Sequence, residues 1–150
     1  MSEGIIGLDR VLRRVSRIES NITRKIEKPL KAAGTYMIGS IVRNFNESGR
    51  PNKWAPLAAS TMRRRRRGKG KGGVKPLIDS GRLRNSESMR VRSEGVEVGT
   101  NMVQAKRQHF GYPGGSGRGH AKTPARPYML LQDPEDFDAI GYIFMRHIRS

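Results

Sequence analysis

The 150-residue sequence contains no cysteine, and it is poor in aromatic residues, in acidic residues and in long apolar runs. Without cysteine the chain has no disulfide framework, no cysteine-ligated zinc site, no iron–sulfur cluster and no thiol nucleophile. The longest apolar run covers only residues 139–145, far short of the roughly 20 residues that span a bilayer. The first twelve residues hold only the apolar pair Ile5–Ile6, too little for a signal peptide. We therefore expect an untargeted, intracellular protein with no membrane segment.

Positive charge dominates the composition, because 30 Lys and Arg face 13 Asp and Glu and leave a formal net charge of +17. Leu, Ile, Val and Phe together make up only about a fifth of the residues. That share is just above the roughly 20% below which a highly charged chain is expected to be disordered. A chain of this length forms one domain, so we expect a single thin core that neighbouring subunits help to stabilise.

The N-terminal third carries a helical pattern, with apolar residues at steps of three and four from residue 5 to residue 45. Proline removes a backbone donor and clashes with the preceding turn, so Pro29 predicts a kink or a split into helices near 5–27 and 29–46. We expect residues 1–28 to form a helical arm that lies across the domain or docks on another subunit. Residues 29–150 then form one domain.

The middle of the chain combines one apolar anchor with a basic, glycine-rich stretch. Trp54 lies beside proline and leucine and is expected to pack on the core. Residues 63–73 predict a mobile loop that cannot pack. Three interpretations stay open for it: phosphate binding, a solvated loop, and docking on an acidic protein surface that orders the loop. The candidate partner-binding residues are Arg63, Arg64, Arg65, Arg66, Arg67, Lys69 and Lys71.

The second half predicts a small sheet and a final helix. Alternating residues from Met89 to Val98 predict a hairpin in which Val91 lies opposite Val98 and Arg92 opposite Glu97. Residues 104–110 predict a short helix or strand, and residues 125–131 a strand or turn packed on the hairpin. A helix is predicted over 134–148, with Asp133 as its N-cap. The fold class is α+β, with the helices packed on a small antiparallel sheet.

No constellation of catalytic residues emerges from the sequence. The glycine-rich stretches do not match a phosphate-binding loop, and Ser80-Gly81 is not part of a nucleophile elbow. His109, His120 and His147 are far apart, so structural roles are expected for them. The acidic residues 133, 135, 136 and 138 are explained by capping and by the helix dipole. We therefore expect no enzyme activity, no cofactor and no metal site.

Several motifs in sequential order resemble the phage virion morphogenesis family of tail-completion proteins, which includes the Mu-like neck protein. They are Ile38–Phe45 with Trp54–Leu57 and Thr61, Leu77–Ser86, Val96–Asn101, Ala105 with Gln108–Gly111, and Pro124–Tyr128. Together they cover roughly residues 34–149. The residues assigned to the family motif are Trp54, Leu57, Gly81, Leu83, Gly99, His109, Gly111, Arg126 and Pro127.

The resemblance implies a structural protein of the head–tail neck that completes the tail or joins it to the capsid connector. It implies a virion location, with the host cytoplasm as the site of assembly, and neck, connector and tail proteins as partners. A thin core beside a surplus apolar stripe fits a homo-oligomeric ring, expected to be hexameric. Arg126 is expected to hold backbone groups rather than a substrate. The alternative function is that of a basic nucleic-acid-binding protein, and it is supported only by the net positive charge and the arginine run.

Overall fold

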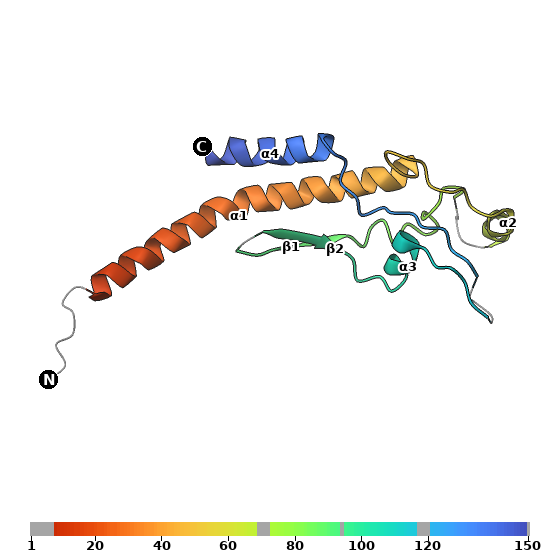
Figure 1. The fold of residues 1–150 in the computed structure, drawn as a ribbon, viewed down its shortest axis with the longest axis horizontal. Helices are drawn as coiled ribbons and strands as arrows, with labels where there is room; N and C mark the ends of the chain where they lie inside the picture. Colours follow the sequence, from red (N-terminus) through yellow and green to blue (C-terminus); the bar gives the residue numbers. More distant parts are fainter. Residues whose placement is uncertain (1–7, 69–72, 94, 117–120, 150) are drawn as a thin grey trace.

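The computed structural model describes residues 8–68, 73–93, 95–116 and 121–149. Along the chain these residues form α1 (Leu8–Glu47), α2 (Ala59–Arg67), β1 (Ser88–Val91), β2 (Val96–Gly99), α3 (Ala105–Phe110) and α4 (Glu135–Ile148). Figure 1 shows a long N-terminal helix, a C-terminal helix beside it and a small antiparallel sheet. The predicted α+β fold class is confirmed.

The long N-terminal helix is continuous, and the predicted division into two helices is wrong. Pro29 lies inside α1, whose axis bends only gently in Figure 1. Proline removes one backbone hydrogen bond from a helix interior. The turns that follow are held by packing, since Pro29, Leu30 and Ala33 are buried. Tertiary contacts therefore carry the helix through a residue that the sequence alone predicts to break it.

The C-terminal half of α1 lies between two other elements. It contacts α4, and it contacts both strands of the hairpin, which lies on the opposite side in Figure 1. Gly34 makes the close approach of the hairpin possible. A Cβ atom at this position would lie 2.7 Å from the Met89 sulfur and 2.7 Å from a Val96 methyl carbon. The hairpin therefore packs where α1 presents no side chain.

The hairpin exists as predicted, but its register differs from the prediction by two residues. The observed pairs are Ser88 with Gly99, Met89 with Val98, Arg90 with Glu97 and Val91 with Val96. The predicted pairs Val91–Val98 and Arg92–Glu97 are therefore wrong as ladder partners. A shift of two residues keeps every side chain on its predicted face, so the alternation could not distinguish the two registers. Arg92 still reaches Glu97 diagonally, with Nε 2.9 Å from Oε1.

A small aromatic cluster forms the core at the C-terminal end of α1. It consists of Ile41, Phe45, Trp54, Leu83 and Tyr128, all of them buried. The ring of Phe45 meets Trp54 edge to face at 5.9 Å and lies 4.8 Å from the ring of Tyr128. Trp54 is thus the core anchor that the sequence predicted. The core is thin, as the low aliphatic content implied.

The arginine run is helical, which corrects the predicted loop at residues 63–67. These residues form the second half of α2, consistent with the high helix propensity of arginine. Arg65 turns inward and donates hydrogen bonds to the carbonyl oxygens of Gly73, Lys75 and Ile78 at 2.8, 3.0 and 3.0 Å. Its guanidinium also lies 3.5 Å from a carboxylate oxygen of Asp79. Lys69 and Lys71 lie outside the described residues.

Candidate assembly surface and its buried polar network

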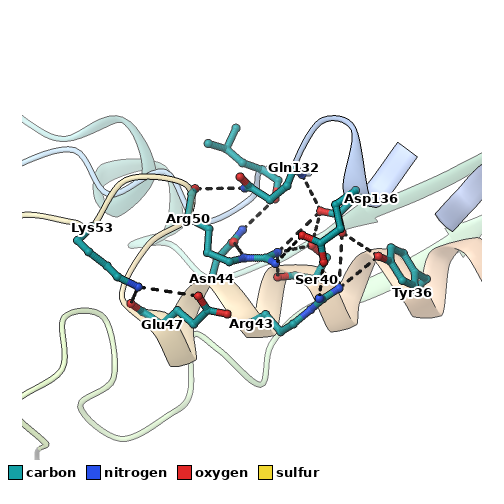
Figure 2. A network of polar contacts seen from close by, with 11 residues as sticks. Tyr36, Ser40, Arg43, Asn44, Glu47, Arg50, Lys53, Gln132 and Asp136 are labelled. Carbon is teal, nitrogen blue, oxygen red and sulfur yellow. Dashed lines mark hydrogen bonds and ion pairs between the residues drawn. The ribbon is translucent and has the colours of Figure 1, made fainter. Parts of the chain in front are cut away.

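Asp136, on the first turn of α4, is the centre of a buried polar network (Figure 2). Its side chain is fully buried. The carboxylate accepts hydrogen bonds from the Tyr36 hydroxyl at 3.0 Å, the Ser40 hydroxyl at 2.5 Å and the Gln132 backbone N–H at 2.6 Å. Tyr36 and Ser40 lie one turn apart on α1. One carboxylate therefore joins α4 to two successive turns of the long helix.

Two arginines balance the charge of this carboxylate. Arg43 lies 3.6 Å from one Asp136 oxygen, and Arg50 lies 3.8 Å from the other. Arg43 also donates to Glu135 at 2.8 Å, at the exposed edge of the network. Arg50 donates to the Asn44 side-chain oxygen at 2.9 Å and to the Ser40 hydroxyl at 2.7 Å. The two cations thus offset the cost of burying a carboxylate.

The same network holds the segment that leads into α4. The Asn44 amide donates to the carbonyl oxygens of Tyr128 and Leu130, each at 2.8 Å. The Gln132 side chain donates to the Arg50 carbonyl at 3.1 Å. Residues 128–132 are therefore held mainly by α1 and by the loop that follows it. Residues 125–131 are predicted to pack on the hairpin. This contact is found only in the core, where Val98 of β2 packs against the cluster that contains Tyr128.

The electrostatics keep Asp136 ionised. Burial is the largest influence on this carboxyl and by itself would raise its pKa. The hydrogen bonds from Gln132, Ser40 and Tyr36, together with the positive charge of Arg50, outweigh burial and hold the pKa of Asp136 below its usual range. Both oxygens of the carboxylate accept hydrogen bonds, and an arginine lies within 4 Å of each. The arrangement is suited to holding two helices together, and it leaves little capacity for proton transfer.

Sequence reasoning missed this network. It assigned Asp133 as the N-cap and explained Asp136 by a favourable interaction with the helix dipole. The structure places Pro134 at the cap position, with no side-chain capping bond, so the Asp133 assignment is wrong. The available signal was helical spacing: Asp136 shares a face with Ile140, Ile143 and His147. An acidic residue in the apolar stripe of an amphipathic helix indicates a buried, partnered charge.

The predicted motif residues are mostly structural. Trp54 and Leu83 lie in the core, and the Trp54 indole donates to the Pro127 carbonyl at 3.3 Å. Arg126 donates to the carbonyl oxygens of Ala55 and Pro56 at 3.0 to 3.2 Å, as predicted for a structural arginine. Burial is the main cause that lowers the pKa of this guanidinium, and the charge of Arg65 lowers it further.

The remaining motif residues lie in turns and at element ends. Burial lowers the pKa of His109, whose Nδ1 accepts the Met129 N–H at 3.4 Å. Gly111 has a φ of 79°, and a Cβ there would lie 2.8 Å from the Ala125 nitrogen. Gly81 also has a positive φ, of 76°. Gly99 ends β2, and Leu57 is half-buried after the core tryptophan. These residues have structural positions in the fold, and in the described part of the chain none of them belongs to a cluster of reactive side chains.

Glu87 is a half-buried acidic residue whose two carboxylate oxygens are inaccessible to solvent. Among the described residues neither of its carboxylate oxygens has a hydrogen-bond partner, and neither has the nearby Tyr128 hydroxyl. Burial raises the pKa of Glu87 to about 7. Burial, with the charge of Glu87 as a smaller cause, raises the pKa of Tyr128 to about 12. An ionised Glu87 is therefore unfavourable in the folded state.

We expect Glu87→Gln to stabilise the protein at pH 8 and to leave it nearly unchanged at pH 5. Because the folded-state pKa is raised, the penalty is absent below the unfolded-state pKa and grows as the pH rises through about 7. The gain at pH 8 should be about 1–2 kcal/mol, since residual solvent screens part of the effect. Urea unfolding at both pH values measures it. Glu97→Gln, at an exposed site paired with Arg92, is the control and should give no gain at pH 8.

The N-terminal half of α1 exposes an apolar stripe, and we call residues 8–28 the arm. In Figure 1 the arm extends past the end of α4, and its span is about 31 Å at helical rise. Six apolar side chains of the arm are between 37% and 58% exposed. They are Val11, Leu12, Val15, Ile18, Ile22 and Ile26. They form one continuous helix face that no described element covers.

The outer face of α4 carries a second apolar surface. Phe137, Tyr142, Met145 and Ile148 are between 51% and 71% exposed. Gly141 lies among them, and a Cβ there would meet nothing within 4 Å. Soluble monomers rarely leave extended apolar patches in water, and such patches mark sites of protein contact. The arm and the outer face of α4 together form the candidate assembly surface.

The family model of the phage virion morphogenesis family matches residues 6–149, nearly the whole chain. The chain belongs to this family. Membership indicates a structural or assembly role in phage tails and a virion-associated protein, and it favours a structural over an enzymatic role. No curated protein and no solved structure gave a match.

Two further observations on this virion morphogenesis protein concern metal binding and membrane-spanning helices. Within the described ranges, no three His, Asp or Glu side chains are grouped so that they could hold a metal ion. None of the helices in the described part of the chain is long and apolar enough to cross a membrane.

Proposed function

We propose that this protein is a structural component of the head–tail neck that completes the tail or joins it to the capsid connector, and that it acts as a ring. Family membership supports a role in tail assembly. The observation that carries the proposal further is the unpartnered apolar stripe of the arm. Such a stripe is stable in water only when another surface covers it.

A second copy of the chain provides a suitable cover. The arm and the outer face of α4 are different surfaces of one subunit, so contact between them is heterologous. Heterologous contacts close into rings when the rotation between subunits closes. The proposed location is therefore the virion neck, and the proposed assembly is a hexameric ring in contact with neck, connector and tail proteins.

Mass measurement and negative-stain imaging of the purified protein, with and without duplex DNA, test the ring. We expect a mass near six times 16.8 kDa and ring-shaped particles without DNA, at tens of micromolar protein and in moderate salt. A single-chain mass under these conditions, unchanged by added tails or connectors, would contradict the proposal. Assembly only on duplex DNA would favour the alternative nucleic-acid-binding function.

The neck role has its own test in extracts from cells infected by a phage that lacks this gene. Such extracts should accumulate filled heads and tails that do not join, and added purified protein should restore joined particles. If the tails are incomplete before joining, electron microscopy will show aberrant tail ends instead. Normal joined particles without the protein would contradict the neck role even if the ring forms.

A further inference from the structure

A basic groove lies between α2, the loop at residues 77–83 and the segment at residues 121–126. Its volume is about 870 Å³, within the range of ligand-binding clefts. Three cationic side chains on its lining have no hydrogen bond or ion pair with any described residue. They are Arg64, Arg82 and Lys122. The groove thus presents unpaired positive charge in a concave site.

Two further arginines line the groove, and they are already positioned. Arg65 and Arg126 are held by the backbone carbonyl bonds described above, and Asp79 is the single acidic residue on the lining. Five cations therefore face one carboxylate, which is itself mostly exposed. A ligand that brings carboxylates would gain charge-assisted hydrogen bonds from Arg64, Arg82 and Lys122, and these bonds are stronger than neutral ones.

The rest of the lining combines neutral polar residues with an aliphatic part, and the aliphatic part indicates the kind of anion. Leu57 and Leu77 are half-buried, and Leu83 belongs to the core, yet all three line the groove. A nucleic-acid backbone offers phosphates but no side chain to cover leucines, and generic phosphate binding would use every exposed arginine of α2 alike. A peptide segment with aliphatic side chains between carboxylates would satisfy both parts of the lining.

Among the described residues, the chain does not present such a segment free of other contacts. The main acidic cluster in these residues, at 133–138, lies at the start of α4, and two of its four acidic side chains are engaged there. Asp136 is buried in the polar network, and Glu135 is paired with Arg43. We therefore assign the segment to another protein.

We propose that the groove binds an acidic peptide segment of a partner protein, with carboxylates paired to Arg64, Arg82 and Lys122 and an aliphatic side chain on Leu57 and Leu77. This goes beyond the proposed neck role and does not depend on the ring. It also divides the arginine run by function. Arg65 is structural, Arg64 faces the partner, and Arg63, Arg66 and Arg67 are exposed outside the groove.

The test uses the full-length protein and three labelled probes in fluorescence anisotropy. The first probe is a ten-residue peptide of Asp and Glu around two central leucines, and the second replaces both leucines with serine. The third is a short DNA duplex. The variants are Arg64→Glu, Arg82→Glu and Lys122→Glu, and Arg66→Glu on the same helix is the matched control.

We expect each groove variant to weaken the leucine peptide about tenfold or more, while Arg66→Glu changes its affinity by less than about threefold. The serine peptide should bind at least about fivefold more weakly than the leucine peptide.

Thermal unfolding checks that each variant is folded. Three results would overturn the proposal. They are an equal loss of peptide affinity in Arg64→Glu and Arg66→Glu, equal affinity for the two peptides, and no binding of either peptide. So would duplex DNA that binds more tightly than the leucine peptide and depends on the same groove residues. A variant mass that drops from ring to monomer would show that the groove binds a second copy, which also overturns it.

Discussion

Asp136→Ala is expected to lower the free energy of unfolding by about 3–5 kcal/mol, the range found when one partner of a buried charge network is removed. The variant leaves the Arg50 guanidinium, the Ser40 hydroxyl and the Gln132 N–H without their shared acceptor. Urea unfolding at pH 7 measures the loss. Because the core of this domain is thin, a loss of that size is a large part of its total stability.

Asp138→Ala is the matched control for this prediction. Asp138 lies two residues further along the same first turn of α4, is exposed, and its side chain has no hydrogen bond or ion pair with any described residue. Its replacement removes only a favourable charge near the helix N-terminus and should cost about 0.3–1 kcal/mol. Equal losses for the two variants would show that Asp136 acts only through the helix dipole and would contradict the network.

The pH dependence gives an independent check on Asp136. The pKa of Asp136 is lowered in the folded state, so its stabilisation is present above the unfolded-state pKa and is lost as the pH falls through the folded-state value. The wild-type protein should therefore lose stability below about pH 4, the usual range of an aspartate. In Asp136→Ala this part of the acid loss should be absent.

The second large effect concerns the arm. The double variant Ile18→Asp/Ile22→Asp should reduce the assembled protein to single chains at tens of micromolar, because it places two charges in the centre of the apolar stripe. Burying an unpaired charge in an interface costs several kcal/mol, which corresponds to at least about a thousandfold in affinity. Sedimentation measures the mass. Circular dichroism should report a folded domain with nearly unchanged helix content, because both side chains are exposed in the single chain.

Ser16→Asp/Ser20→Asp is the control for the arm. It adds the same charge within the same turns, but on the opposite face of the helix, where both serines are exposed. This variant should assemble as the wild type does. Loss of assembly in both double variants would attribute the effect to charge and not to the stripe. Normal assembly of Ile18→Asp/Ile22→Asp would remove the arm from the proposed interface.

Periodic features of this protein could be predicted from sequence, and features set by tertiary contact could not. The stripe of α1 and the spacing of α4 are local patterns, so the helical span of α1 and the bounds of α4 were predicted closely, although α1 was predicted as two helices. The continuity of α1 at Pro29 was not, because it depends on packing of the turns that follow. Hairpin alternation gave the correct faces, whereas the register depends on how Met89 and Val96 fit against Gly34.

The candidate site shows the same division. Exposed apolar residues in the arm followed directly from the helical stripe beside a small core. The buried network did not, because aspartate near a helix start is usually explained by capping, and only the contacts with Tyr36 and Ser40 distinguish Asp136 from Asp138. The arginine run has uniform composition, so sequence could not reveal that Arg65 alone turns inward while its neighbours stay in solvent.

Pro29 divides α1 into two parts in which the rate of amide hydrogen exchange should differ, and this difference can be used to detect assembly. Burial of α1 side chains begins at this residue, and the missing N–H weakens the ladder at the same place. The two halves of one helix therefore differ in local unfolding: amide hydrogens after Pro29 are protected by the packed domain, whereas those of the arm open by fraying alone. In a free subunit amide exchange should be fast up to this proline and slow beyond it. Slow exchange throughout α1 then becomes a direct signature that the arm has found its partner.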